Sequence, residues 1–134
     1  MGLLIDSNVL IAAERGLFSL PDWATTLPDT PMALSAITAS ELLHGVHRAK
    51  EPSIAQKRLR FVEYILDLFP VIPFDLQIAR VHAQLWADLQ TKGQSIGAHD
   101  LLIAATARTL DYGVVTGNER EFRRIPGLQV VKPF

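Results

Sequence analysis

Short apolar stretches alternate with segments of helical period along this chain, and that alternation constrains the fold most strongly. The stretches that predict strands are residues 2–5, 32–35, 71–72, 113–116 and 128–131. Between most of them, hydrophobic residues recur at the three- and four-residue spacing of amphipathic helices. Short strands separated by helices form a parallel sheet with both faces covered. The pattern therefore predicts an α/β fold built on a short parallel sheet.

The helical segments have recognisable ends. Helices are predicted at residues 7–15, 19–28, 39–49, 53–68, 76–91 and 98–110. Pro52 is expected to end the third of these, and Asp75 to cap the start of the fifth, which ends at Gly93. Leu59, Val62, Leu66 and Phe69 are spaced to form one apolar face of the fourth helix.

Length and composition set the class of protein. The 134 residues fit one domain, and 49% hydrophobic with 20% charged residues is the balance of a globular protein. No apolar run approaches the roughly 20 residues that cross a bilayer, and we expect no signal peptide. The absence of cysteine excludes disulfides and thiolate metal sites, and it fits a reducing cytoplasm.

A carboxylate stands where burial should be most costly, in the stretch GLLIDSNVLI. Asp6 follows the first predicted strand and is almost surrounded by apolar residues. A buried carboxylate needs a charged partner, hydrogen bonds or a metal ion. Capping of the next helix explains Asp6 poorly, since Ser7 could cap without a charge. In open parallel sheets, ligands bind beyond the carboxyl ends of the strands, where Asp6 lies.

Three further acids lie near predicted helix starts: Glu41, Asp100 and Glu121. Each has a structural explanation. Residues 38–41, Thr-Ala-Ser-Glu, fit a capping box, and residues 118–121 fit a looser version of it. The helix dipole would favour Asp100 by ~0.3–1 kcal/mol without any function. Taken singly, each of these acids is more often a cap or dipole partner than a catalyst.

Convergence of the four acids would change this interpretation. Elements that lie side by side in a doubly wound sheet can bring all four carboxylates to one edge. Neighbouring carboxylates repel, so some take up protons unless a divalent cation relieves the conflict. All-oxygen ligands suit Mg²⁺ or Mn²⁺, which can polarise a phosphoryl oxygen and lower the pKa of a bound water. We therefore expect Asp6 to help hold a metal ion.

Four stretches of the chain resemble the PIN domain family and, more closely, the VapC-type toxins of bacterial toxin–antitoxin pairs. They are LLIDSNVLIAA, ITASELLHGV, GQSIGAHDLLIAATA and VVTGNEREFRRIPGL, which match in order and spacing along essentially the whole chain. The resemblance implies a three-layer α/β/α fold and a metal-dependent endoribonuclease that cuts single-stranded or loop regions of RNA. It also implies a homodimer and a small antitoxin whose C-terminal segment covers the acidic cleft.

The resemblance assigns roles to the polar residues. The four acids of the implied site are Asp6, Glu41, Asp100 and Glu121. The supporting residues are Ser7, Thr116 and Asn118. Asp6 and Asp100 match the principal metal-binding aspartates, and Glu41 completes the metal's ligands or aligns the attacking water. Many family members carry aspartate at positions 118 and 121, whereas this chain has the Asn-then-Glu version familiar in the VapC branch. By this resemblance Glu121 would either hold a second metal ion or orient a water.

Two other functional classes stay open. The first is a PIN-like module that has lost catalysis and only binds RNA or a partner, although the presence of all four acids argues against it. The second is a phosphorylated receiver domain, suggested by Lys132 and Pro133 after the last predicted strand. A receiver needs an acidic pair after its first strand, and Asp6 stands alone there. His99, next to Asp100, is interpreted as a helix-start residue.

Basic residues gather in two groups despite a formal net charge of −1. The first group is Arg48, Lys50, Lys57, Arg58 and Arg60. The second group is Arg120, Arg123 and Arg124. From the charge pattern alone, solvated helix faces are the better interpretation. Two patches that contact phosphates are the more specific alternative.

Overall fold

The computed structural model describes residues 1–133 and has a five-stranded parallel sheet at its centre. The strands are β1 (Leu3–Ile5), β2 (Met32–Ser35), β3 (Val71–Ile72), β4 (Gly113–Val115) and β5 (Val130–Val131). The helices are α1 (Ser7–Glu14), α2 (Leu20–Thr25), α3 (Ala36–Arg48), α4 (Pro52–Leu68), α5 (Leu76–Thr91), α6 (Ala98–Leu110) and α7 (Glu119–Phe122). The strand order is β3-β2-β1-β4-β5, and every pair is parallel.

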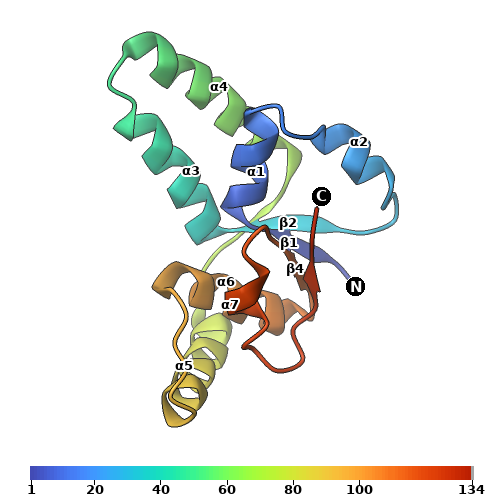
Figure 1. The fold of residues 1–134 in the computed structure, drawn as a ribbon, viewed down its shortest axis with the longest axis vertical. Coiled ribbons are helices and arrows are strands. Elements are labelled where there is room, and N and C mark those ends of the chain that lie inside the picture. The colour runs from blue at the N-terminus through green and yellow to red at the C-terminus, as the bar shows by residue number, and fades with distance from the viewer. Residues whose placement is uncertain (134) are drawn as a thin grey trace.

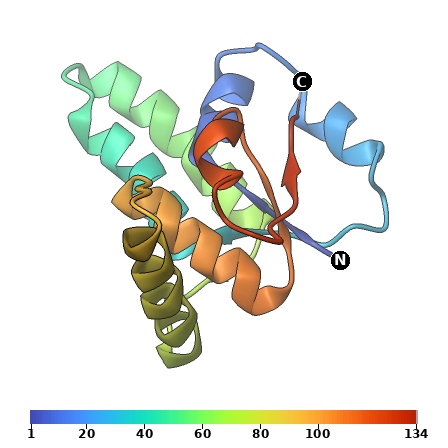
Figure 2. The same cartoon turned by 60° about the horizontal axis from the view of Figure 1, so that its bottom comes forward.

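Helices cover both faces of the sheet, so the predicted three-layer α/β/α fold is confirmed (Figures 1 and 2). Helices α1 to α4 pack on one face and α5 to α7 on the other. Successive strand residues point to opposite faces: Leu4 joins the core under α5 and α6, while Leu3 and Ile5 join the core under α1 and α4. Burial on both sides explains why the strands are apolar throughout, apart from Ser35 at the end of β2.

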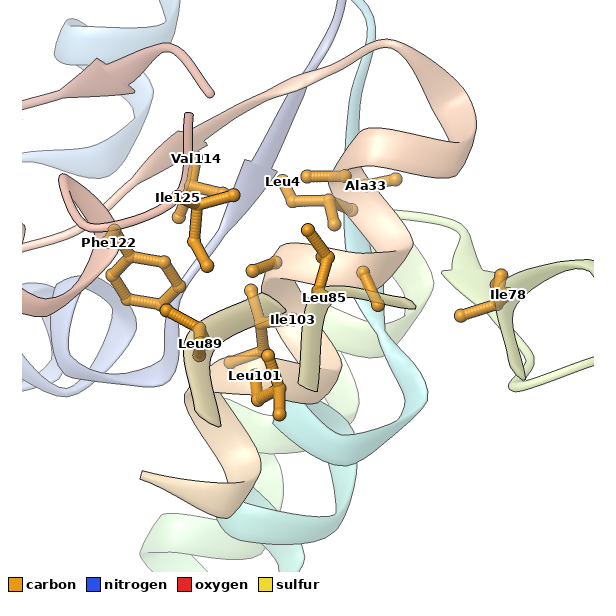
Figure 3. Packing of buried hydrophobic residues seen from close by; sticks show 13 residues of the cluster. Leu4, Ala33, Ile78, Leu85, Leu89, Leu101, Ile103, Val114, Phe122 and Ile125 are labelled. Atoms are coloured by element: carbon orange, nitrogen blue, oxygen red, sulfur yellow. The ribbon is translucent and has the colours of Figure 1, made fainter. Parts of the chain in front are cut away.

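The core on the α5 and α6 face is shown in Figure 3. Leu4 of β1 and Val114 of β4 pack there with Ile103 of α6 and Phe122 of α7, all at 0% exposure. Three buried alanines of α6, at positions 104, 105 and 107, allow that helix to lie close to the sheet. This packing fixes the start of α6 beside the carboxyl ends of β1 and β4, where the candidate site lies.

The predicted start of the third helix is wrong by three residues. Helix α3 begins at Ala36, because Ser35 at the end of β2 caps it by accepting the Ile37 N–H at 3.3 Å. The capping box predicted for residues 38–41 is therefore not formed. Thr38 lies in the first turn, fully buried, and its Oγ1 has no hydrogen-bond partner within residues 1–133.

The two ends of α5 match the sequence prediction, whereas two features of α4 differ from it. Asp75 caps α5 by accepting the Ile78 N–H at 2.9 Å, and Gly93 follows that helix with a φ of +66°, both as predicted. Pro52 occupies the first position of α4, so it starts the next helix and does not end the previous one. Leu59 is 40% exposed and lies off the apolar face that Val62 forms.

Among residues 1–133, none of the helices combines the length and the apolar character that a membrane-spanning helix needs.

The strand predicted at residues 113–116 ends at Val115, which leaves Thr116 in the following loop. The last strand is shorter than predicted and holds only Val130–Val131.

Candidate active site

The carboxyl ends of the central strand β1 and its neighbour β4 form the floor of the candidate site. Asp6 follows β1 directly and is only 4% exposed. Its Oδ1 accepts the Ser7 N–H at 2.8 Å, and its Oδ2 accepts the Thr116 hydroxyl at 2.8 Å. Asp6 is also the N-cap of α1, so the expectation that capping does not explain it is wrong in part. Its second oxygen, Oδ2, takes no part in this capping and lies in the candidate site.

Burial dominates the electrostatics of Asp6. Loss of solvation raises the pKa of this carboxyl, and the charge of Glu41 acts in the same direction. The hydrogen bonds from Thr116 and from the Ser7 backbone oppose that rise. Asp6 is therefore held in a fixed orientation by polar donors at a position that still disfavours its negative charge.

Asn8 is a site residue that sequence reasoning missed. Its Nδ2 lies 3.3 Å from Asp6 Oδ2 and 3.3 Å from Thr116 Oγ1, while its Oδ1 accepts the Gly117 N–H at 3.0 Å. One amide thus ties the turn after β1 to the turn after β4. The sequence pattern places Asn8 only within the helix predicted at residues 7–15. The sequence does hold a signal for Asn8: an amide side chain, which can donate and accept hydrogen bonds at once, stands two residues after an acid at the end of a strand.

Glu41 reaches the site from the second turn of α3. Its Oε1 accepts the Ser7 hydroxyl at 3.2 Å, and its Oε2 lies 3.3 Å from His99 Nδ1. The carboxylate is therefore held between α1 and the first turn of α6. His99 does lie at the start of its helix, as expected, but its ring also orients Glu41.

Asp100 and Glu121 form a carboxyl–carboxylate pair at the open side of the site. Burial, the hydrogen bond with Glu121 and the charges of Asp6, Glu121 and Glu41 raise the pKa of Asp100 to about 7. The same hydrogen bond, helped by the Gly97 N–H at 3.3 Å, lowers the pKa of Glu121. A hydrogen bond between two carboxyl groups needs one proton, and these opposite shifts place it on Asp100.

The side chain of Asn118 makes no capping hydrogen bond to α7, so the looser capping pattern predicted for residues 118–121 is wrong. Its backbone N–H instead donates to Thr116 Oγ1 at 2.9 Å. Glu119 turns away from the acids and pairs with Arg123 at 2.6 Å and Lys132 at 3.2 Å. Lys132 therefore contacts α7 and not Asp6, which removes the main feature that suggested a receiver domain.

The donor set of the site fits a hard divalent cation in its chemistry. All four predicted acids lie close enough that the charges of Asp6, Glu41 and Glu121 act on Asp100. Within residues 1–133, however, no three acidic or histidine side chains are already positioned to hold one ion. Binding would require the shared proton to leave and the carboxylates to turn. The residues that would hold Mg²⁺ or Mn²⁺ remain Asp6 and Asp100.

The fold and this arrangement of acids define the class of protein. The family model described as PIN domain matches residues 3–128, so the chain belongs to the PIN domain family. Within that family it belongs to the VapC group, as the resemblance predicted. It is 39% identical over 131 residues to Ribonuclease VapC of Rickettsia bellii and 40% identical over 131 residues to Ribonuclease VapC1 of Rickettsia felis. Each match covers 98% of this chain and 96% of the relative.

Solved structures agree with this assignment. The DNA-bound VapBC of Salmonella typhimurium superimposes with a TM-score of 0.89 at 30% identity, covering 100% of this chain and 99% of that one. VapBC2 of Rickettsia felis, bound to a DNA fragment from its promoter, gives a TM-score of 0.86 at 28% identity and covers 98% of both chains.

Proposed function

We propose that this chain is the toxin of a toxin–antitoxin pair, an endoribonuclease that hydrolyses RNA phosphodiester bonds at the acidic site. The observation that carries the proposal is the gathering of four acids from four separate segments, close enough that the other three act with burial to raise the pKa of Asp100. Relatives named as ribonucleases support the reaction class, and VapC relatives of Salmonella typhimurium and Shigella flexneri are named as tRNA(fMet)-specific endonucleases.

Mg²⁺ or Mn²⁺ held by Asp6 and Asp100 would supply positive charge to the phosphoryl oxygens and a bound water of lowered pKa. The protein's own residues do the positioning. Ser7 and His99 hold the Glu41 carboxylate where it can accept the proton of an attacking water. Thr116 fixes Asp6, and Gly97 fixes Glu121 against Asp100.

The partners follow from the same family. VapBC and FitAB complexes among the structural neighbours support a small antitoxin that covers the acidic site.

The proposed assembly is a homodimer that acts in the cytoplasm. It is supported by exposed apolar side chains at and near α5, including Phe74 at 47%, Leu76 at 67% and Trp86 at 54% exposure. Sedimentation of the purified chain, with Trp86→Arg as the disrupting variant, tests the assembly.

The direct test is RNA cleavage by purified protein. We expect cutting with Mg²⁺ or Mn²⁺ that EDTA abolishes, and its loss in Asp100→Asn. Asp88→Asn, the same change at an exposed position of α5, is the matched control and should cleave as the parent does. RNA binding without cleavage under all metal conditions would favour the inert module. Expression without an antitoxin should arrest growth, and an unaffected culture would count against a toxin.

A further inference from the structure

A second polar pocket, of about 200 Å³, opens between α1, α3 and α4, directly beside the acidic site. Helix α1 lies next to the α3–α4 hairpin in both views of the fold (Figures 1 and 2). Arginines from all three segments line the pocket: Arg15, Arg48 and Arg58. Phe61 contributes an aromatic ring. Two acids also line the pocket, Glu14 beside Arg15 and Glu41 in the wall that the pocket shares with the acidic site, so the three arginines leave it a net positive charge.

The pocket divides the first basic group of the sequence. Of its five members only Arg48 and Arg58 line the pocket, whereas Lys57 and Arg60 are exposed on α4 outside it. Arg15 joins from the end of α1, more than 30 residues away in the chain. Arg58 Nη1 donates to the Gly45 carbonyl at 3.0 Å, which holds its guanidinium against α3. The fold therefore gathers these cations, and local sequence does not.

None of these three arginines is paired with an acid within the described part of the chain. The ion pairs of residues 1–133 join His99 to Glu41, and Arg123 and Lys132 to Glu119, and none involves Arg15, Arg48 or Arg58. Cations near the ends of α1 and α3 stabilise helix dipoles, which would account for Arg15 and Arg48. Arg58 lies inside α4 and also serves the end of α3, since it donates to the Gly45 carbonyl of the last turn of that helix. Helix-end stabilisation does not explain why all three arginines line one pocket beside the acids.

We propose that this pocket binds the RNA strand next to the point of cleavage, with a backbone phosphate on Arg15 and Arg48 and a base against Phe61. The inference rests on the proposed function and names the part of the substrate that the site would hold. A phosphate chain entering a cluster of four acids is repelled, so cations beside the cluster must offset that repulsion. Arg48 lies two turns of α3 beyond Glu41, about 10 Å along the helix. Guanidinium forks suit phosphate oxygens, and aromatic rings stack on unpaired bases.

Binding is measured with the full-length Asp100→Asn protein, so that cleavage does not intervene. The probe is a fluorescein-labelled single-stranded RNA, followed by anisotropy at several salt concentrations. We expect Arg48→Ala and Arg15→Ala each to weaken binding about tenfold, as for one lost charged hydrogen bond. The slope of log affinity against log salt should fall by about 0.7 for each lost contact. Arg48→Lys should keep the slope but recover affinity only in part.

Arg60→Ala is the matched control, because it removes the same side chain from α4 outside the pocket and should bind RNA nearly as the parent does. In the cleaving protein, Arg48→Ala should raise KM with little change in kcat, since the arginine binds substrate away from the reacting bond.

Three results would overturn the proposal. The first is that the Arg15 and Arg48 variants bind RNA as tightly as the Arg60 control does. The second is a loss of thermal stability without a loss of RNA affinity, which would assign the arginines to the helix ends. The third is unchanged RNA affinity with lost binding of a partner protein, which would make the pocket a protein-binding site. If the parent protein binds RNA through these arginines but cuts no RNA, the assignment of the pocket stands and the nuclease function is refuted.

Discussion

The proton on Asp100 leads to a quantitative prediction about metal binding. A carboxyl group binds a metal ion as its ionised form, so the ion must displace this proton. With the pKa of Asp100 at about 7, roughly ten molecules are protonated for each ionised one at pH 6, and the ratio is reversed at pH 8. The affinity for Mg²⁺ or Mn²⁺ should therefore rise about tenfold from pH 6 to pH 8, and binding at pH 6 should release about one proton.

Glu121→Gln tests the cause. This change removes one negative charge beside Asp100 and offers an amide N–H to its carboxylate, and both effects lower the pKa of Asp100. Burial, the largest cause of the shift, is unchanged, so the pKa should stay above its ordinary value. The pH dependence of metal affinity should consequently move to lower pH and flatten between pH 6 and 8.

The assay is calorimetry with Mn²⁺ in two buffers of different ionisation enthalpy, which counts released protons, together with a carbon NMR titration of the Asp100 carboxyl group. Glu119→Gln is the matched control, because Glu119 pairs with Arg123 and Lys132 and faces away from Asp100. An affinity that is equal at pH 6 and pH 8, or a carboxyl titration centred near the ordinary 3.8, would refute the reasoning.

Three further substitutions test individual contacts. Glu41→Gln keeps an oxygen for the Ser7 hydroxyl, so denaturant unfolding should change by less than about 1 kcal/mol while RNA cleavage falls by at least about 100-fold; parent-like cleavage would remove Glu41 from the chemistry. Asn8→Ala removes the amide that orients Asp6, so metal affinity by calorimetry should fall roughly 10–100-fold with the fold retained by circular dichroism. Thr38→Val replaces a buried hydroxyl that has no partner, so urea denaturation should show about 1 kcal/mol more stability; a loss of stability would mean that the hydroxyl is satisfied.

The sheet and the longer helices were predictable because their signals are local. Helix α5 runs from Leu76 to Thr91 as predicted, since a capping aspartate precedes it and a glycine in the left-handed region follows it. Helix α6 runs from Ala98 to Leu110 as predicted from the buried stretch LLIAATA, residues 101–107. The three-layer architecture followed from the alternation of these elements.

The start of α3 shows what local signals do not decide. The sequence offers two hydroxyl caps, Ser35 and Thr38, and both are good N-cap residues. The structure uses Ser35, which starts the helix directly after β2 and places Thr38 inside the core. Glu41 then lies a full turn further into the helix than a capping box requires, where it meets Ser7 and His99. Those contacts span 34 and 58 residues, so no local pattern predicts them.

The four acids divide into two kinds, and this division bears on how the site would take up a metal ion. Asp6 and Glu41 are held by hydroxyl, amide and imidazole groups that belong to other elements. Asp100 and Glu121 are held mainly by each other, through one proton. Above about pH 7 that proton is lost. Two carboxylates then face each other, and only the Gly97 N–H and the charges of Arg120 and Arg124 offset their repulsion, on the Glu121 side. Because the pKa of Asp100 is raised in the folded state, this group's contribution to the stability of the metal-free protein is lost as the pH rises from about 4 to about 7. Bound metal restores the missing positive charge, so stabilisation by the ion should grow over the same interval.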